Sequence, residues 1–336
     1  MSSGFPAKTK IGLTTSIPIE IIFAADCIPI DLNNVFITDQ DPERYIAIAE
    51  QAGYPRNMCN WIKGIYGVCR SNPDIEVVVS VVRGDCSNAQ ALMETLTYEG
   101  VHVIPFAYPY DRDRLSLKRE IDKFMAIFNV TVEVVRKTHQ QLNEIRQKLV
   151  KLDTLTWQSS LVSGWTNHYF LVNSSDFKGN PQLFEAELDQ ELKILESRSL
   201  ETPPPRVRLG YIGVPPIILD LYEVLENLET EVVFNEIQRQ FSMPDLETDL
   251  IDQYLNFSYP YDVFGRIPDI KRAVEQRNIN GLIHYTQSFC FRQIEDIIIR
   301  KEVAVPVLTL EGERPALIDE RTKIRLETFI EMLKER

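Results

Sequence analysis

Residues 75–98 read IEVVVSVVRGDCSNAQALMETLTY, and this stretch decides the fold. Its first part, Ile75–Val82, is rich in β-branched residues and shows no alternation of apolar and polar positions. That pattern is typical of a strand buried on both faces. Ser87–Tyr98 then predicts a helix. Strands of this kind belong to parallel sheets that helices cover on both sides, so we expect an α/β fold.

The segments around this stretch continue the alternation. In the first half of the chain we expect strands at Lys10–Thr15, Ile28–Leu32 and Val101–Phe106, and helices at Pro18–Ala25, Pro42–Ala52 and Asn60–Cys69. In the second half we expect strands at Val207–Ile212, Glu231–Asn235, Gly281–Tyr285 and Val305–Leu310, and helices at Pro216–Asn227, Leu246–Asn256, Pro268–Gln276, Cys290–Arg300 and Thr322–Lys334.

The two halves repeat the same order of elements. Ile11-Gly12 corresponds to Leu209-Gly210, and Gly84-Asp85-Cys86 corresponds to Ser288-Phe289-Cys290. We therefore predict a divergent duplication that gives two similar Rossmann-like domains, each with a parallel sheet and right-handed crossovers.

The middle of the chain reads as helical. Leu115–Leu152 predicts a long amphipathic helix or a helix pair, and further helices are expected at Ser159–Asn173 and Leu183–Ser197. Thr202-Pro203-Pro204-Pro205 predicts a stiff linker. The predicted organisation is a first α/β domain over 1–114, a helical segment with the linker over 115–205, and a second α/β domain over 206–336.

Composition narrows the class of protein. The chain has 336 residues, 44% of them hydrophobic, and a formal net charge of −13, which opposes binding to nucleic acid or to an anionic membrane. The N-terminus lacks the apolar core of a signal peptide, and no apolar run is long enough to span a bilayer. We expect a cytoplasmic protein, in which five cysteines do not form a disulfide framework.

Three of the cysteines occupy informative positions. Cys86 and Cys290 follow the third strand of their halves, in equivalent turns near helix starts, and Cys59 begins the helix before the first of these strands. Ligands of open parallel sheets bind beyond the carboxyl ends of the strands. If the two halves face each other, these three thiols converge in the cleft between them. Cys27 and Cys69 are expected to be small buried hydrophobic residues.

Three convergent thiolates suit zinc or an iron–sulfur cluster. Their wide separation in the sequence disfavours a zinc finger, in which cysteines come in close pairs. The alternative is three unrelated cysteines. Loops of the types G-x-x-x-x-G-K-[ST] and G-x-G-x-x-G are absent, so we do not expect the chain itself to bind ATP or NAD.

Other polar residues are candidates near this site. Glu20 is either an acid–base carboxylate with a raised pKa or a first-turn carboxylate stabilised by the helix dipole. Ser16 either binds substrate or caps the following helix, and capping is the expected role. His284 is either a proton donor or a hydrogen-bonded core residue. Lys63 and Arg83 either offset cluster charge or face solvent.

Four stretches give the chain a resemblance to a known family: Gly12–Glu20 continuing to Ala24-Ala25, Cys59–Lys63, Gly84–Cys86, and His284–Cys290, followed by Glu311-Gly312-Glu313 and Arg321. Together they resemble the 2-hydroxyacyl-CoA dehydratase and benzoyl-CoA reductase family, whose subunits are α/β proteins around an iron–sulfur centre. The family often has Cys-Asp where this chain has Asp85-Cys86.

The resemblance implies a [4Fe-4S] cluster held by Cys59, Cys86 and Cys290, with one iron left for another ligand. It implies an anaerobic lyase or oxidoreductase. In this family an ATP-hydrolysing iron–sulfur activator supplies a low-potential electron that reduces an acyl-CoA thioester to a ketyl radical. Its subunits form homodimers or heterodimers with a related subunit.

Two alternatives stay open. One is a double-cubane reductase of small molecules, but two cubanes at three thiolates each exceed the five cysteines of this chain, so such a cluster would be shared across chains. The other is a non-catalytic protein, either an electron-transfer or cluster-scaffold protein or a clusterless relative that keeps the fold alone.

Overall fold

The computed structural model describes residues 4–197 and 207–336, so the predicted linker at 202–205 lies outside the described residues. Eight strands form two wholly parallel sheets: Lys10–Leu13 (β1), Ile28–Asp31 (β2), Val77–Arg83 (β3), His102–Ala107 (β4), Val207–Gly213 (β5), Thr230–Asn235 (β6), Gly281–Gln287 (β7) and Val307–Gly312 (β8). The strand orders are β2-β1-β3-β4 and β6-β5-β7-β8. The predicted α/β class with two Rossmann-like parallel sheets is confirmed.

The chain divides into two compact units that are discontinuous in sequence. Unit 1 comprises Met1–Gln147, Asn173–Glu185 and Phe241–Tyr261, and unit 2 comprises Lys148–Val172, Ala186–Gln240 and Asp262–Arg336. This grouping differs from the three consecutive segments predicted with boundaries after 114 and 205. The helical segment is shared between the units because two of its helices, Val132–Gln158 (α7) and Pro181–Ser197 (α9), each begin in unit 1 and end in unit 2.

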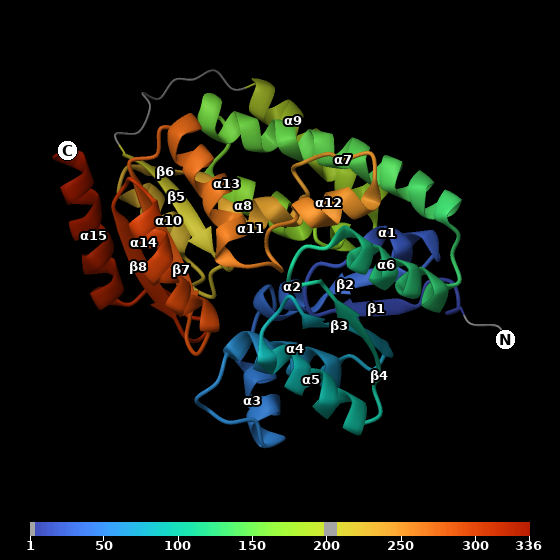
Figure 1. Ribbon diagram of the computed structural model, residues 1–336. Coiled ribbons are helices and arrows are strands. Elements are labelled where there is room, and N and C mark those ends of the chain that lie inside the picture. Colours follow the sequence, from blue (N-terminus) through green and yellow to red (C-terminus); the bar gives the residue numbers. More distant parts are fainter. Residues whose placement is uncertain (1–3, 198–206) are drawn as a thin grey trace. The chain divides into compact units, whose positions relative to one another are not determined.

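In unit 1 helices cover both faces of the first sheet (Figure 1). The elements of unit 1 are Ile19–Ala24 (α1), Leu32–Ile37 (α2), Glu43–Gln51 (α3), Asn60–Ser71 (α4), Ser87–Tyr98 (α5), Arg114–Phe128 (α6), the short 3-10 helix Phe177–Gly179 (η1) and Leu250–Asn256 (α12). Helices α4 and α5 lie on one face, and α1 and α6 lie on the other. Val77–Val81 of β3 is entirely buried, as the sequence predicts for a strand covered on both sides.

Unit 2 repeats this arrangement around the second sheet. Its elements are Gly164–Asn173 (α8), Leu221–Asn227 (α10), Glu236–Phe241 (α11), Val263–Gln276 (α13), the 3-10 helix Phe291–Glu295 (η2), Asp296–Glu302 (α14) and Glu320–Lys334 (α15). Helices α13 and α14 cover one face, where Ile270 and Ile299 pack with Leu282 of β7. On the other face, α15 places Phe329 and Leu333 against Gly281.

The central strands of the two sheets each carry a glycine where a side chain does not fit. A Cβ at Gly12 of β1 would lie 2.9 Å from Ile75, and one at Gly210 of β5 would lie 2.5 Å from Leu282. The shared strand order and these paired glycines fit the predicted duplication.

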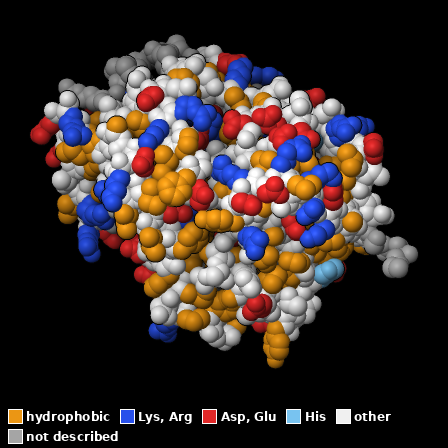
Figure 2. Space-filling view, viewed as in Figure 1, with side chains coloured by type: hydrophobic (Ala, Val, Ile, Leu, Met, Phe, Trp, Pro, Cys, Tyr) orange, Lys and Arg blue, Asp and Glu red, His pale blue; other side chains and the backbone are white. Residues whose placement is uncertain are grey.

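No helix in the described parts of the chain is both long and apolar enough to cross a membrane. Basic and acidic side chains are interspersed on the face shown in Figure 2.

Candidate functional site

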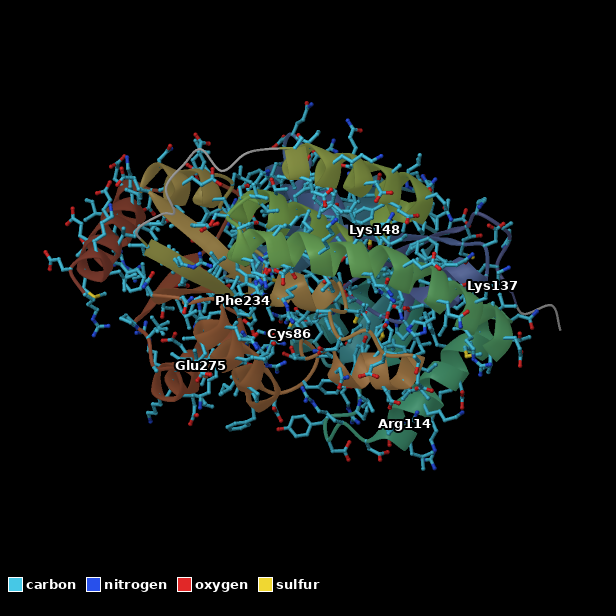
Figure 3. All side chains as sticks on the ribbon, turned by 90° about the horizontal axis from the view of Figure 1, so that it is seen from above. Cys86, Arg114, Lys137, Lys148, Phe234 and Glu275 are labelled. Carbon is cyan, nitrogen blue, oxygen red and sulfur yellow. The ribbon has the colours of Figure 1, made fainter. Side chains whose placement is uncertain are left out.

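Each of the three cysteines predicted as cluster ligands is the residue directly before a helix. Cys59 precedes α4, Cys86 follows β3 and precedes α5, and Cys290 follows β7 and precedes η2. Such N-cap residues lie beside the free N–H groups of the first helical turn. The predicted placement of Cys86 and Cys290 in equivalent strand-to-helix turns is therefore confirmed. Figure 3 labels Cys86.

Cys59 and Cys86, both in unit 1, lie close enough for their charges to interact. Burial, with further contributions from Asp85 and Cys59, raises the pKa of the Cys86 thiol to about 12, although the backbone N–H groups of Ala89 and Asn88 oppose this shift. Neither cysteine is in a disulfide. Cys86 is thus a neutral thiol at neutral pH, and a metal ion would have to displace its proton in order to bind the sulfur.

Cys27 and Cys69 have different surroundings. Cys27 lies before β2, and Cys69 lies in the last turn of α4; both are buried and free of disulfides. Burial raises the pKa of Cys69 to about 12. Neither residue begins a helix, which agrees with the expectation that both are small buried hydrophobic residues.

The turn before Cys86 depends on a glycine. Gly84 has a φ of +99°, and a Cβ there would lie 2.9 Å from Pro260 and 3.0 Å from Tyr108. In unit 2 Phe289, with a φ of 65°, directly precedes Cys290. Both thiols are thus presented by turns that use left-handed backbone.

Glu20 is an ionised, fully buried partner of Arg146. The two side chains form an ion pair at 2.8 Å in unit 1, and Tyr254 and Gln253 donate hydrogen bonds to the carboxylate at 2.9 and 3.2 Å. Burial opposes ionisation, but the charges of Arg146 and His139 and the hydrogen bonds outweigh it and lower the pKa of Glu20. Of the two alternatives, the acid–base carboxylate with a raised pKa does not hold, because Arg146 from the distant helix α7 compensates the carboxylate. Glu20 does lie in the first turn of α1.

Ser16 does not cap α1, contrary to expectation. The N-cap residue is Pro18, and the buried Ser16 Oγ has no hydrogen-bond partner among the residues described. The Tyr108 hydroxyl donates to the Ser16 carbonyl oxygen at 3.0 Å, which fixes the turn after β1. A buried hydroxyl without a partner is costly, which keeps Ser16 a candidate for contact with a bound group.

His284 lies on the fully buried strand β7 of unit 2. Its Nδ1 is 2.7 Å from an oxygen of Asp296, which also accepts hydrogen bonds from Arg300 and Thr309. Its Nε2 is buried and has no hydrogen-bond partner in the described chain. A carboxylate that fixes one ring nitrogen leaves the other to exchange a proton.

Lys63 and Arg83 differ in exposure and pairing. The Lys63 side chain is fully buried, and its ammonium is 2.9 Å from Glu50 and donates to the Arg56 carbonyl. Its charge is therefore already compensated. Arg83 is exposed at the carboxyl end of β3.

The thiols fit a metal centre only in part within each unit. Unit 1 contributes Cys59 and Cys86, and unit 2 contributes Cys290. Within either unit, no three described His, Cys, Asp or Glu side chains gather closely enough to hold one metal ion. Neither unit by itself therefore supplies three of the candidate thiolates. Soft sulfur donors suit iron–sulfur chemistry.

A comparison with protein-family models matches residues 14–333 to 2-hydroxyglutaryl-CoA dehydratase, D-component. The chain belongs to this family. The match includes all three candidate cysteines together with Ser16 and Glu20, and it confirms the predicted family resemblance. A search of curated proteins found no match.

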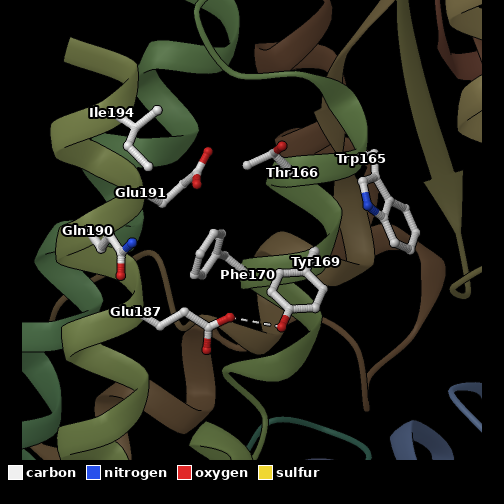
Figure 4. A pocket seen from close by; sticks show the side chains of 8 residues that line it. All are labelled: Trp165, Thr166, Tyr169, Phe170, Glu187, Gln190, Glu191 and Ile194. Carbon is white, nitrogen blue, oxygen red and sulfur yellow. Dashed lines mark hydrogen bonds between the residues drawn. The ribbon is translucent and has the colours of Figure 1, made fainter. Parts of the chain in front are cut away.

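This dehydratase-family chain has a cavity in each unit. In unit 1 a cavity of about 280 Å³ lies where β3 and β4 end against α6. In unit 2 a cavity of about 320 Å³ lies between α8 and α9 (Figure 4). Trp165, Phe170 and Glu191 line the second cavity, and there the Tyr169 hydroxyl donates to Glu187 at 2.9 Å. Of the polar candidates, Arg83 lines the cavity of unit 1, whereas the three cysteines, Ser16, Glu20 and His284 line neither cavity.

A second buried ion-pair network, in unit 2, was not expected from the sequence. Arg266 pairs with Glu236 at 2.7 Å and also with Glu295, and Glu236 accepts a hydrogen bond from the Gly213 N–H at 2.9 Å. Burial favours the neutral acid, but the Arg266 charge outweighs it and lowers the pKa of Glu236, with a contribution from His284. This network lies beside the imidazole in the dehydratase-family fold.

Proposed function

We propose that this chain is the iron–sulfur component of an ATP-activated, low-potential radical dehydratase or reductase that acts on an acyl-CoA thioester. The proposal rests on one observation above all: Cys59, Cys86 and Cys290 each directly precede a helix, two of them in equivalent turns of duplicated sheets. Membership of the dehydratase family supports the type of reaction.

We propose Cys59, Cys86 and Cys290 as the ligands of one [4Fe-4S] cluster. Three thiolates leave one iron open to a further ligand. When bound, the cluster supplies one-electron chemistry at low potential. The N–H groups of a first helical turn favour thiolate. At Cys86 the N–H groups of Ala89 and Asn88 act in this direction, but burial outweighs them and raises the pKa, so the thiolate depends on the bound iron.

The polar candidates receive distinct roles. The Ser16 hydroxyl, buried and without a partner in the described chain, binds a polar group of the substrate. His284 donates or accepts a proton at Nε2, since Asp296 holds its Nδ1. Glu20 has a structural role, because it is ionised and compensated by Arg146.

The proposed partners follow from the same chemistry. A separate ATP-hydrolysing iron–sulfur activator delivers the electron, because this sequence has no phosphate-binding loop of its own. The functional assembly is a homodimer or a heterodimer with a related subunit, and the location is cytoplasmic.

Two other functions are distinguishable. A double-cubane reductase of small molecules would have to share its cluster across chains, because five cysteines are too few for one chain. An electron-transfer or scaffold protein would accept electrons without converting a thioester.

The test is an anaerobic assay of the purified chain with an activator of this family, ATP and a panel of 2-hydroxyacyl-CoA thioesters. Turnover that depends on ATP and activator is the expected result. Cluster reduction without turnover, with or without a related subunit, would favour the carrier function. The absence of any iron–sulfur absorption after anaerobic purification would refute the proposal.

A further inference from the structure

The cavity of unit 1 is positively charged, unlike the chain as a whole. Arg83, Arg119 and Lys123 line it, and the only acidic residue in its lining is Glu120. Lys123 pairs with Glu120 at 2.6 Å. Neither arginine forms a close ion pair among the described residues, although the charge of Arg119 contributes to lowering the pKa of Asp113. The lining of this cavity is therefore basic in a protein of net charge −13.

The cavity also has the position of a ligand site. Arg83 ends β3, and Ala107 ends β4, so the cavity opens at the carboxyl edge of the parallel sheet, where ligands of such sheets bind. Arg119 and Lys123 come from one face of α6, four residues apart. Strand β3 and helix α6 thus contribute basic side chains to the same cavity.

Contacts within unit 1 connect this cavity to the candidate site. Tyr108 lines the cavity, and its backbone N–H donates to the Arg83 carbonyl at 2.9 Å. Its hydroxyl donates to the Ser16 carbonyl at 3.0 Å. Arg83 is also followed by Gly84-Asp85-Cys86, which ends in the thiol proposed as a ligand. The cavity therefore shares Tyr108 with the turn at Ser16, and Arg83 in its lining lies three residues before Cys86 along the chain.

We propose that this cavity binds the phosphate groups of a nucleotide-bearing ligand. Arginine forks match phosphate oxygens in pairs, and a volume of about 280 Å³ accommodates a phosphate or pyrophosphate group rather than a whole cofactor. Assignment of the cavity to phosphate stands on the structure. Its assignment to the nucleotide end of the acyl thioester rests on the proposed function.

Calorimetric titration of the full-length protein with adenosine 3′,5′-bisphosphate, and separately with inorganic pyrophosphate, tests the phosphate site. We expect binding that weakens as salt rises, and Arg83→Ala and Arg119→Ala should each weaken it about tenfold. Both side chains are exposed, so the variants should fold. Lys118→Ala is the matched control, because Lys118 neighbours Arg119 on α6 but lies outside the cavity and pairs with Asp122.

Absence of binding by the unaltered protein, or an equal loss in Lys118→Ala, would overturn the inference. The titration needs neither cluster nor activator, so phosphate binding without thioester turnover would count against the proposed function alone. If turnover occurs, Arg83→Ala should raise KM for the CoA thioester and leave KM for the corresponding acyl-pantetheine unchanged. Equal KM values for the CoA thioester in variant and unaltered protein would show that the cavity does not bind this substrate.

Discussion

The two units present different chemistry at the carboxyl edges of sheets with the same strand order. Unit 1 carries two thiols, Cys59 and Cys86, together with the exposed Arg83. Unit 2 carries one thiol, Cys290, at this edge and, in the middle of β7, a buried histidine, His284, whose Nδ1 is fixed by a carboxylate. Both units thus have a cysteine after the third strand of the sheet, with different groups around it.

The charges buried beneath these edges also differ in origin. In unit 1 the Glu20 carboxylate follows β1, and its arginine, Arg146, comes from α7 outside the repeat. In unit 2 the Glu236 carboxylate follows β6, and Arg266 comes from α13 within the repeat. Each unit thus pairs a buried carboxylate with a buried arginine, but the two arginines come from different parts of the fold.

The largest expected effect concerns the histidine that only unit 2 carries. His284→Gln should lower turnover of the proposed reaction about 10²- to 10⁴-fold, the usual contribution of a positioned proton donor or acceptor. Iron content should stay unchanged, since His284 is not a proposed ligand. Anaerobic kinetics with iron analysis would check both, with the exposed His102→Gln as control. An unaltered kcat in His284→Gln would show that His284 is a core residue without a role in proton transfer.

Removal of either buried arginine should strongly destabilise the fold. Arg146→Met leaves Glu20 without its cation, and Arg266→Met does the same to Glu236, so each should cost about 3–5 kcal/mol in free energy of unfolding. Urea denaturation measures the loss. Arg114→Met, which removes an exposed pair with Asp252, should cost about 1 kcal/mol or less. Similar costs for all three would mean that burial does not distinguish these pairs.

The units should respond oppositely to pH. In unit 1 the buried Asp31 N–H donates to Asp176 at 2.7 Å, and burial, with the charge of Asp31, raises the pKa of Asp176 to about 7. The folded state then binds the extra proton, so stability should fall by up to about 1.4 kcal/mol per pH unit as pH rises from about 4 to 7. In unit 2, Arg277 and Arg239 outweigh burial and lower the pKa of Asp153, whose contribution is lost only as pH falls below about 4.

Asp176→Asn should therefore flatten the decline in stability between pH 4 and 7. Urea denaturation at a series of pH values measures this slope. Asp153→Asn should leave that window unchanged and act through lost contacts with Arg277 instead. A slope that is identical in Asp176→Asn and the unaltered protein would show that Asp176 is ionised throughout.

The smallest effect is expected from removal of helix caps, which should lower the free energy of unfolding by a similar amount in both units. Asp113 accepts a hydrogen bond from the Ser116 N–H at the start of α6, and Asp319 accepts one from Thr322 at the start of α15. Alanine at either position should cost about 1 kcal/mol in thermal or urea denaturation. A cost confined to one unit would break the symmetry that the duplicated fold implies.

Much of the fold was predictable because its strands are buried on both faces. The continuous apolar run of β3 predicts a buried parallel strand. The correspondence of Gly84-Asp85-Cys86 with Ser288-Phe289-Cys290 predicts the same order of elements in both halves. The predicted start of a helix is wrong where it rests on a proline. Pro268 lies within α13, which begins after the Asp262 cap. Likewise α10 begins at Leu221 rather than Pro216.

The short helices α2 and α11 were missed because each follows a strand directly, without a turn residue between them. Among the site residues, the cysteines were found because their position relative to strands is visible in sequence. Arg146 and Tyr254 were not, because they reach Glu20 from segments far along the chain. The sequence alone predicts that an arginine on a long amphipathic helix faces solvent, because its buried partner lies far away in the sequence.

The most direct measurement is the iron and acid-labile sulfide content of anaerobically purified protein and its five single Cys→Ser variants. One cluster per chain is expected, and Cys59→Ser, Cys86→Ser and Cys290→Ser should each deplete it, while Cys27→Ser and Cys69→Ser retain it. Full iron content in Cys290→Ser, or equal content in all five variants, would contradict a cluster held by thiols from both units.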